Sequence, residues 1–197
     1  MRYPSILRIM AAVSLLLFAS HQARAAVIIN TIETVSGVEL SASGTLDLTG
    51  LTNFGFSSGY PQVIPGQGYV IGGGGGGSVF TQIYSGLSGP ATFGTGGQTL
   101  NTSASGDFLA ISNFGQWLSV ANGFVSGSTI SSSTFFSGAT IASLGMGPGT
   151  YTWTWSTDSV SLVVPSEVAE VPGPPAFALF CLGLAGLGAA GRLRKRR

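Results

Sequence analysis

The central part of this chain offers carboxylates as its only side chains for strong acid–base chemistry. The single histidine, His21, and the single cysteine, Cys181, lie near the two ends, and no Lys or Arg occurs between Ala26 and Gly191. A Ser–His–Asp triad needs a base for its nucleophile, and zinc or haem sites usually need His or Cys ligands. The central residues supply neither.

A pair of carboxylates can hydrolyse a glycosidic bond when the two groups face each other across it. No local pattern marks such a pair among the candidate acids Glu33, Glu39, Asp47, Asp107 and Asp158. We therefore predict that the protein is not an enzyme and has no metal centre and no cofactor. Loose Ca²⁺ binding by these acids stays open as an alternative, although their spacing matches no known calcium loop.

The stretch "QVIPGQGYVIGGGGGGSVFTQ" contains six consecutive glycines, Gly72 to Gly77. A phosphate-binding loop would need Gly-Lys followed by Ser or Thr, and calcium-binding glycine repeats need interspersed Asp. Both are missing here. The stretch therefore predicts a flexible loop or the tip of a hairpin.

Aromatic residues offer a second kind of site. In "GTYTWTWST", Trp153 and Trp155 alternate with Thr, so they project to the same face of a predicted strand. Together with Trp117, they would form an exposed strip that stacks on sugar rings, which makes a carbohydrate-binding surface module the alternative function. We favour the ordinary interpretation of such residues, which is that they belong to the core.

The elements that must position these residues are strands. From residue 26 to 163, segments such as "AVIINTIETV" and "DSVSLVV" alternate or are rich in β-branched residues, and glycine-containing turns recur between them. Glycine also disfavours helix interiors. This pattern predicts an all-β body built as an antiparallel sandwich or jelly roll.

Charge is segregated along the chain. All eight basic residues lie at the two ends, whereas the seven acidic residues lie between them and give the central region a formal charge of −7. Because cations supply most of the affinity for phosphate backbones, this distribution excludes nucleic acid as a partner of the central region.

The N-terminal residues 1–25 have the layout of a secretory signal peptide. Arg2 and Arg8 precede an apolar stretch over residues 9–19, and a polar segment then ends in the small-residue cleavage pattern of Ala23 and Ala25. We predict export through the Sec translocon and cleavage after Ala25. An uncleaved anchor is the alternative, but the apolar stretch is short for a membrane span.

The C-terminal part predicts a linker, a membrane helix and a basic tail. Residues 164–175 contain four prolines, and residues 176–191 carry no charge. The fifteen residues 176–190 would rise about 22 Å as a helix, a marginal length for a hydrocarbon core of about 30 Å. The tail, residues 192–197, would stay cytoplasmic as a stop signal formed by Arg192, Arg194, Lys195, Arg196 and Arg197.

Two alternatives concern this apolar run. It would fit a buried core helix less well, because a core helix would contain fewer glycines and would rarely be followed at once by a basic chain end. Cys181 within it has an ordinary interpretation as a small apolar filler, and lipidation is the alternative.

A Pro-containing motif, a short Gly/Leu/Ala-rich span and a terminal basic cluster together resemble the PEP-CTERM sorting tail of Gram-negative bacteria. The resemblance covers residues 171–197, with Val171, Pro172, Gly173 and Pro174 at the motif. The family usually has Glu where this chain has Gly173. The segment "GATIASLGMGPGTYTWTW" also resembles the C-terminal part of many secreted proteins with such tails.

The resemblance implies recognition by an exosortase, a membrane-embedded processing enzyme that removes the tail. It also implies export through an inner-membrane intermediate to the cell surface or the extracellular matrix. The expected function is that of a structural protein associated with the surface, the biofilm or exopolysaccharide.

Overall fold

The computed structural model describes residues 26–166, and every element of regular structure in this range is a strand or a short 3₁₀ turn. The all-β prediction is therefore confirmed for these residues. Within them, no helix has the length and apolar character that a membrane crossing requires. The predicted cleavage site at Ala25, the motif around Gly173, the span over residues 176–191 and the basic tail all lie outside the described residues.

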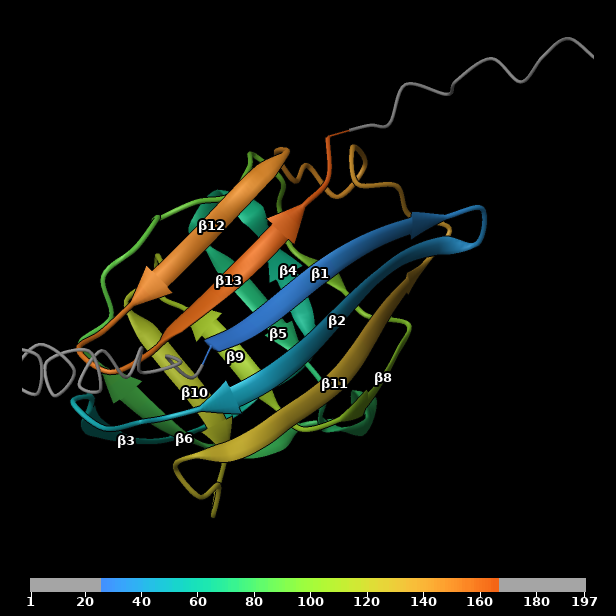
Figure 1. Cartoon of the computed structure of the whole chain (residues 1–197). Helices are drawn as coiled ribbons and strands as arrows, with labels where there is room; N and C mark the ends of the chain where they lie inside the picture. Colours follow the sequence, from blue (N-terminus) through green and yellow to red (C-terminus); the bar gives the residue numbers. More distant parts are fainter. Residues whose placement is uncertain (1–25, 167–197) are drawn as a thin grey trace, which may run out of the picture. The chain divides into compact units, whose positions relative to one another are not determined.

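A six-stranded sheet forms the front layer in Figure 1. Its order across the sheet is β12 (Gly149–Thr154), β13 (Ser159–Val164), β1 (Ala26–Thr34), β2 (Gly37–Leu46), β11 (Ser128–Ser137) and β8 (Ser103–Gly106). The chain divides into two units between Val164, where β13 ends, and Pro165.

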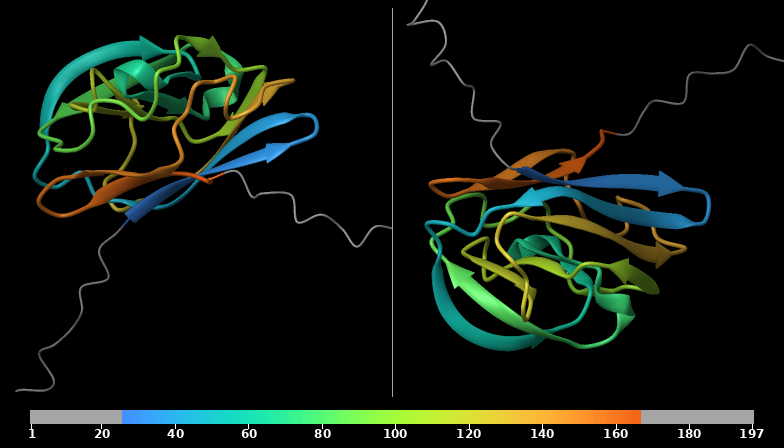
Figure 2. Two further views of the ribbon diagram at one scale, coloured as in Figure 1. Left: turned by 90° about the horizontal axis from the view of Figure 1, so that it is seen from above. Right: turned by 60° about the horizontal axis from the view of Figure 1, so that its bottom comes forward.

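A seven-stranded sheet forms the second layer, and Figure 2 shows the two layers from other sides. Its order is β3 (Thr52–Gly59), β6 (Val79–Ser85), β10 (Trp117–Ala121), β9 (Leu109–Ser112), β5 (Tyr69–Gly72), β4 (Gln62–Ile64) and β7 (Thr99–Leu100). Two 3₁₀ turns, Pro65–Gln67 and Gly74–Gly76, flank β5.

One pair of neighbouring strands departs from the expected antiparallel arrangement. β1 and β13 run parallel, from the pair Ala26 and Ser159 to the pair Asn30 and Val163, whereas the other pairs are antiparallel. Each of these two strands also belongs to an antiparallel pair, β1 with β2 and β13 with β12. The two antiparallel pairs lie side by side, so β1 and β13, the first and last strands of the body, are neighbours inside the sheet.

The core lies between the two sheets and follows directly from strand alternation. In β1, Val27 and Ile29 are buried while their neighbours face outward, and β13 repeats the pattern with Val160 and Leu162. The opposing layer contributes, among others, Leu118 of β10 to the same hydrophobic cluster. One continuous core therefore joins both sheets.

The glycine run joins β5 to β6, which are not paired with each other, so it is not the tip of a hairpin. The expected loop is present, but it is a packed one. The backbone N–H of Gly73 donates to Thr134 Oγ1 at 3.0 Å, and a Cβ placed on Gly73 would lie 1.8 Å from the carbonyl oxygen of Asp107. Glycine is needed at Gly73 because no side chain fits there.

Alanine substitutions along this run are expected to have graded effects. Gly73→Ala should lower the free energy of unfolding by at least about 2 kcal/mol, because its left-handed φ of 76° is strained for alanine and its Cβ would clash. Gly75→Ala shares the positive φ but has open space, so about 1–2 kcal/mol is expected. Gly77→Ala, at φ −104° and without close neighbours, should stay within about 0.5 kcal/mol.

Urea unfolding of the three variants measures these differences. Equal losses in all three variants would show that the run is not packed against Asp107 as described.

Candidate functional site

The central carboxylates are spread over the body and serve mainly as acceptors for backbone and hydroxyl groups. Glu33 accepts from the N–H of Ile141 at 2.7 Å, and Asp107 accepts from the N–H of Ser131 at 2.9 Å. Within residues 26–166, no group of three or more His, Cys, Asp or Glu side chains is close enough together to hold a metal ion.

Asp47 and Asp158 are the two acids that the fold brings together. Asp158 is fully buried, and its two carboxylate oxygens accept from the N–H of Asp47 at 2.7 Å and from its neighbour Ser159 at 2.6 Å. Asp47 accepts from the N–H of Thr49 and from the hydroxyl of Ser126, both at 2.9 Å. These contacts join the end of β2 to the turn before β13.

The surroundings shift the two pKa values in opposite directions. Burial raises the pKa of Asp158 above its ordinary value of 3.8, although the two N–H donors oppose this shift. Hydrogen bonding from Thr49 is the main reason why the pKa of Asp47 lies below 3.8. Because every donor to the pair lies in a loop or at the first residue of a strand that the pair fastens, we assign the pair a structural role.

Two of the three tryptophans that were candidates for sugar stacking lie in the core. Trp153 is fully buried and Trp155 is 7 % exposed, while Thr154 between them faces outward. Their indole N–H groups donate to backbone oxygens of Pro90 and Asp47, each at 2.9 Å. The stacking alternative is therefore wrong for Trp153 and Trp155, because strand alternation turns both toward the core. Trp117 remains partly exposed.

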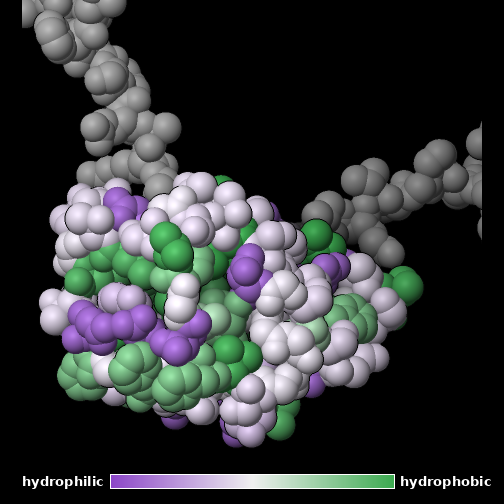
Figure 3. Space-filling view, turned by 90° about the horizontal axis from the view of Figure 1, so that it is seen from below, coloured by the Kyte–Doolittle hydropathy of each residue, from purple (hydrophilic) through white to green (hydrophobic). Residues whose placement is uncertain are grey.

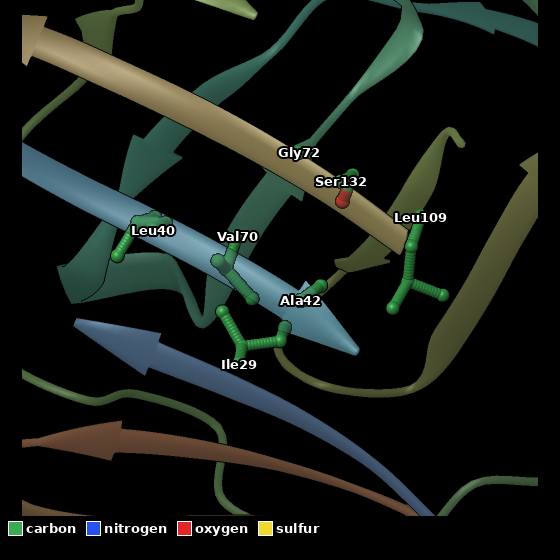
Figure 4. A pocket seen from close by; sticks show the side chains of 7 residues that line it. All are labelled: Ile29, Leu40, Ala42, Val70, Gly72, Leu109 and Ser132. Carbon is green, nitrogen blue, oxygen red and sulfur yellow. The ribbon is translucent and has the colours of Figure 1, made fainter. Parts of the chain in front are cut away.

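A hollow between the two sheets, shown in Figure 4, is too small for a ligand. It leaves about 10 Å³ of free space, at most room for a single water molecule. Its walls are mostly apolar: Ile29, Leu40, Ala42, Val70, Gly72, Leu109 and Ser132. We interpret it as a packing gap of the core.

The outer face of the seven-stranded sheet carries a larger depression. Leu118 and Val120 of β10 point into the core, so Trp117 and Ser119 point to the opposite, outer face. On that face two adjoining hollows of about 200 and 60 Å³ share Tyr69, Ser112 and Trp117 as lining residues. Since they share these walls, the two hollows lie next to each other, and we call them together the outer groove.

Small, aliphatic and aromatic side chains together line the outer groove. Ala110, Ser112 and Ser119 lie within the depression and are buried, although they face away from the main core. The aromatic lining residues are Tyr69, Phe108, Phe114 and Trp117. The amides of Gln67 and Asn113 complete one end. Aromatic rings and hydrogen-bonding groups therefore line the same groove, and none of the lining residues is charged.

The loop between β9 and β10 forms one edge of the outer groove, and its backbone is strained. Asn113 and Phe114 have φ values of 51° and 56°, a left-handed region that is unusual for a bulky aromatic residue. The N–H of Phe114 donates to the carbonyl of Gln67 at 3.1 Å, and the ring is half exposed. Strain of this kind persists only where the surroundings enforce it, and it concentrates at functional sites.

Trp117 has a further aromatic neighbour outside the hollow. The ring centroid of Phe54 on β3 lies 5.3 Å from that of Trp117, with an angle of 30° between the planes. Figure 3, which views the molecule from below Figure 1, shows apolar side chains in patches that hydrophilic ones interrupt. The sequence prediction included Trp117 but missed Tyr69 and Phe114, and the only signal for Phe114 was the turn-forming Asn113-Phe114-Gly115.

The outer face of the six-stranded sheet is different in character, because hydroxyl groups dominate it. The hydroxyls of Thr152 and Ser161 lie 2.9 Å apart on neighbouring strands. The hydroxyl of Ser133 donates to Glu39 Oε1 at 2.7 Å. This face therefore offers many hydrogen-bonding groups.

The described part of the chain is thus an all-β, two-sheet protein with an uncharged groove edged by aromatic rings. No protein-family model, curated protein or solved structure matches the chain.

Proposed function

We propose that the chain is an exported surface or extracellular-matrix protein that catalyses no reaction. In this proposal, residues 1–25 direct export, and the tail from Val171 to Arg197 is sorted by an exosortase-type enzyme after an inner-membrane intermediate. The body is a sandwich or jelly roll that functions outside the cytoplasm, next to exopolysaccharide.

The observation that carries this proposal is that both ends resemble sorting signals while the body between them lacks the side chains of common catalytic sites. Residues 26–166 contain no His, Cys, Lys or Arg. Their paired acids, Asp47 and Asp158, fasten turns and line neither part of the outer groove. A hydroxyl-rich surface without cations suits a protein that works among hydrated polymers, and the tail resembles a known sorting signal.

Intact-mass analysis of the exported protein tests the processing. In a host with an exosortase, we expect a chain that begins at Ala26 and has lost the span and the basic tail. Pro172→Ala with Pro174→Ala should leave the tail attached, whereas Pro165→Ala, outside the motif, should be processed as the wild type. Recovery of a wild-type chain that still ends at Arg197 would contradict the proposal.

A second candidate function is carbohydrate binding by the body, and the outer groove favours it. Trp117 keeps the stacking role that Trp153 and Trp155 lose through burial, and Tyr69 and Phe114 stand beside it at the same groove. Aromatic rings with an apolar face and neighbouring polar groups are the usual means of binding sugars.

A further inference from the structure

We propose that the outer groove binds one chain of an uncharged polysaccharide, without calcium, with Trp117 and Tyr69 as the stacking platforms. The proposal rests on the second candidate function and specifies the chemical class of its ligand. It concerns the body alone and is independent of how the two ends are processed.

The lining matches the two chemical faces of a sugar ring. A pyranose presents C–H groups on its faces and hydroxyls around its edge, so it needs flat apolar surfaces close to donors and acceptors. Trp117 and Tyr69 supply the flat surfaces, and both border the two parts of the groove. Ser112, Gln67 and Asn113 supply hydroxyl and amide groups beside them. A purely apolar ligand would leave these polar groups without partners.

The charges of the body exclude anionic sugars, and the lining of the groove has no carboxylate to pair with a cationic one. No lysine, arginine or histidine occurs in residues 26–166, whereas this range carries five acids. A polyanion such as alginate would meet no cation in the groove and would be repelled by the body as a whole. A calcium bridge would need carboxylates along the groove, but none of its lining residues is acidic.

The groove is also held in shape before any ligand arrives. Phe108 at its inner end is confined by glycines, because a Cβ on Gly59 would lie 2.7 Å from its ring and one on Gly74 would lie 3.0 Å away. At the other end, Gly115 packs against Trp153 so closely that no side chain fits between them. Preformed walls reduce the entropy that binding must overcome.

Affinity electrophoresis of the exported protein tests the proposal. The gels contain neutral glucans, mannans or galactans, or the anionic alginate and polygalacturonate. We expect retardation by at least one neutral polysaccharide, unchanged by EDTA, and none by the anionic ones. The same neutral polymer should protect tryptophan fluorescence from acrylamide, because Trp117 is the only one of the three tryptophans that is not buried.

Matched variants locate the binding. Trp117→Ala should weaken binding at least tenfold, and Trp117→Phe should retain part of it. Phe56→Ala removes another exposed ring, which stacks on Phe80 at 5.5 Å and does not line the groove, so its affinity should stay within twofold of the wild type. Thermal unfolding confirms that each variant is folded.

Several outcomes would overturn the proposal in distinguishable ways. Binding that is confined to anionic polymers, or that needs calcium, would refute the ligand class but leave carbohydrate binding in place. No binding to any polysaccharide would refute the second candidate function as well. Loss of a dimer in Trp117→Ala, without sugar binding by the wild type, would make the groove a contact between copies. None of these results bears on export, which the mass analysis decides.

Discussion

Replacing Trp153 by alanine is expected to lower the free energy of unfolding by about 3–5 kcal/mol, the usual cost of removing a large buried aromatic side chain. The indole is fully buried at the end of the core, where its ring meets Phe93 edge-on with 6.5 Å between centroids. Its removal would leave a cavity and would also orphan the Pro90 carbonyl, to which the indole N–H donates.

Contacts with glycine make this site unusually intolerant of change. Gly89 and Gly115 approach the indole so closely that a Cβ on either would lie 2.5 or 2.3 Å from it. When Trp153 is shortened to alanine, the backbone at Gly89 or Gly115 can fill the space only if the loop that contains it also moves. Since Gly115 belongs to the loop that presents Phe114, Trp153→Ala should also loosen one edge of the outer groove.

Urea unfolding, followed by far-ultraviolet circular dichroism, measures the effect. Trp117→Ala is the matched control, because it removes the same side chain from a partly exposed position and should cost only about 1 kcal/mol. Trp153→Phe keeps an aromatic ring but loses the hydrogen bond, so an intermediate loss of about 1–3 kcal/mol is expected. Similar losses for Trp153→Ala and Trp117→Ala would contradict the burial described here.

The tryptophans show which features of the fold can be predicted from the sequence and which cannot. Alternation in "GTYTWTWST" correctly predicts that Trp153 and Trp155 share one face, because the side-chain period of a strand is fixed by its backbone. Alternation cannot tell which face meets the other sheet. That depends on which strands pair, and here the first and last strands of the body become neighbours.

The residues that line the outer groove were harder to predict from the sequence for a related reason. Tyr69, Phe114 and Trp117 come from two separate segments, and only the pairing of β5 with β9 and of β9 with β10 places them side by side. Their spacing along the chain has no periodicity that would reveal this. The glycine run shows the same limit, since its composition predicts a loop but not that Asp107 and Phe108 pack against it.

Substitution of Asp158 is expected to have the second large effect. Asp158→Ala removes the acceptor for two backbone N–H groups, those of Asp47 and Ser159, at a fully buried position. Each unsatisfied buried donor costs about 1–3 kcal/mol, so we expect a total loss of about 2–5 kcal/mol. Asp158→Asn can satisfy only one of the two donors, and a smaller loss of about 1–3 kcal/mol is expected.

Asp107→Asn is the control for this prediction, because Asp107 also accepts from a backbone N–H but is exposed. Its replacement should change the free energy of unfolding by about 0.5 kcal/mol or less, since water can satisfy the N–H of Ser131. An equal effect of Asp107→Asn and Asp158→Asn in chemical unfolding would show that the burial of Asp158 is not what makes its hydrogen bonds matter.

The pH dependence provides a check that a simple packing defect would not reproduce. Because burial raises the pKa of Asp158, the folded protein holds this proton more tightly than the unfolded chain does. The contribution of Asp158 to stability is therefore greatest below pH 3.8 and decreases as the pH rises through the raised pKa. Asp47 acts in the opposite sense, because its pKa is lowered and its contribution is lost as the pH falls below 3.8.

Asp158→Asn abolishes only the pH dependence that comes from Asp158. The difference in free energy of unfolding between the wild type and Asp158→Asn should therefore be larger at pH 4 than at pH 7, and a constant difference would contradict a raised pKa for Asp158.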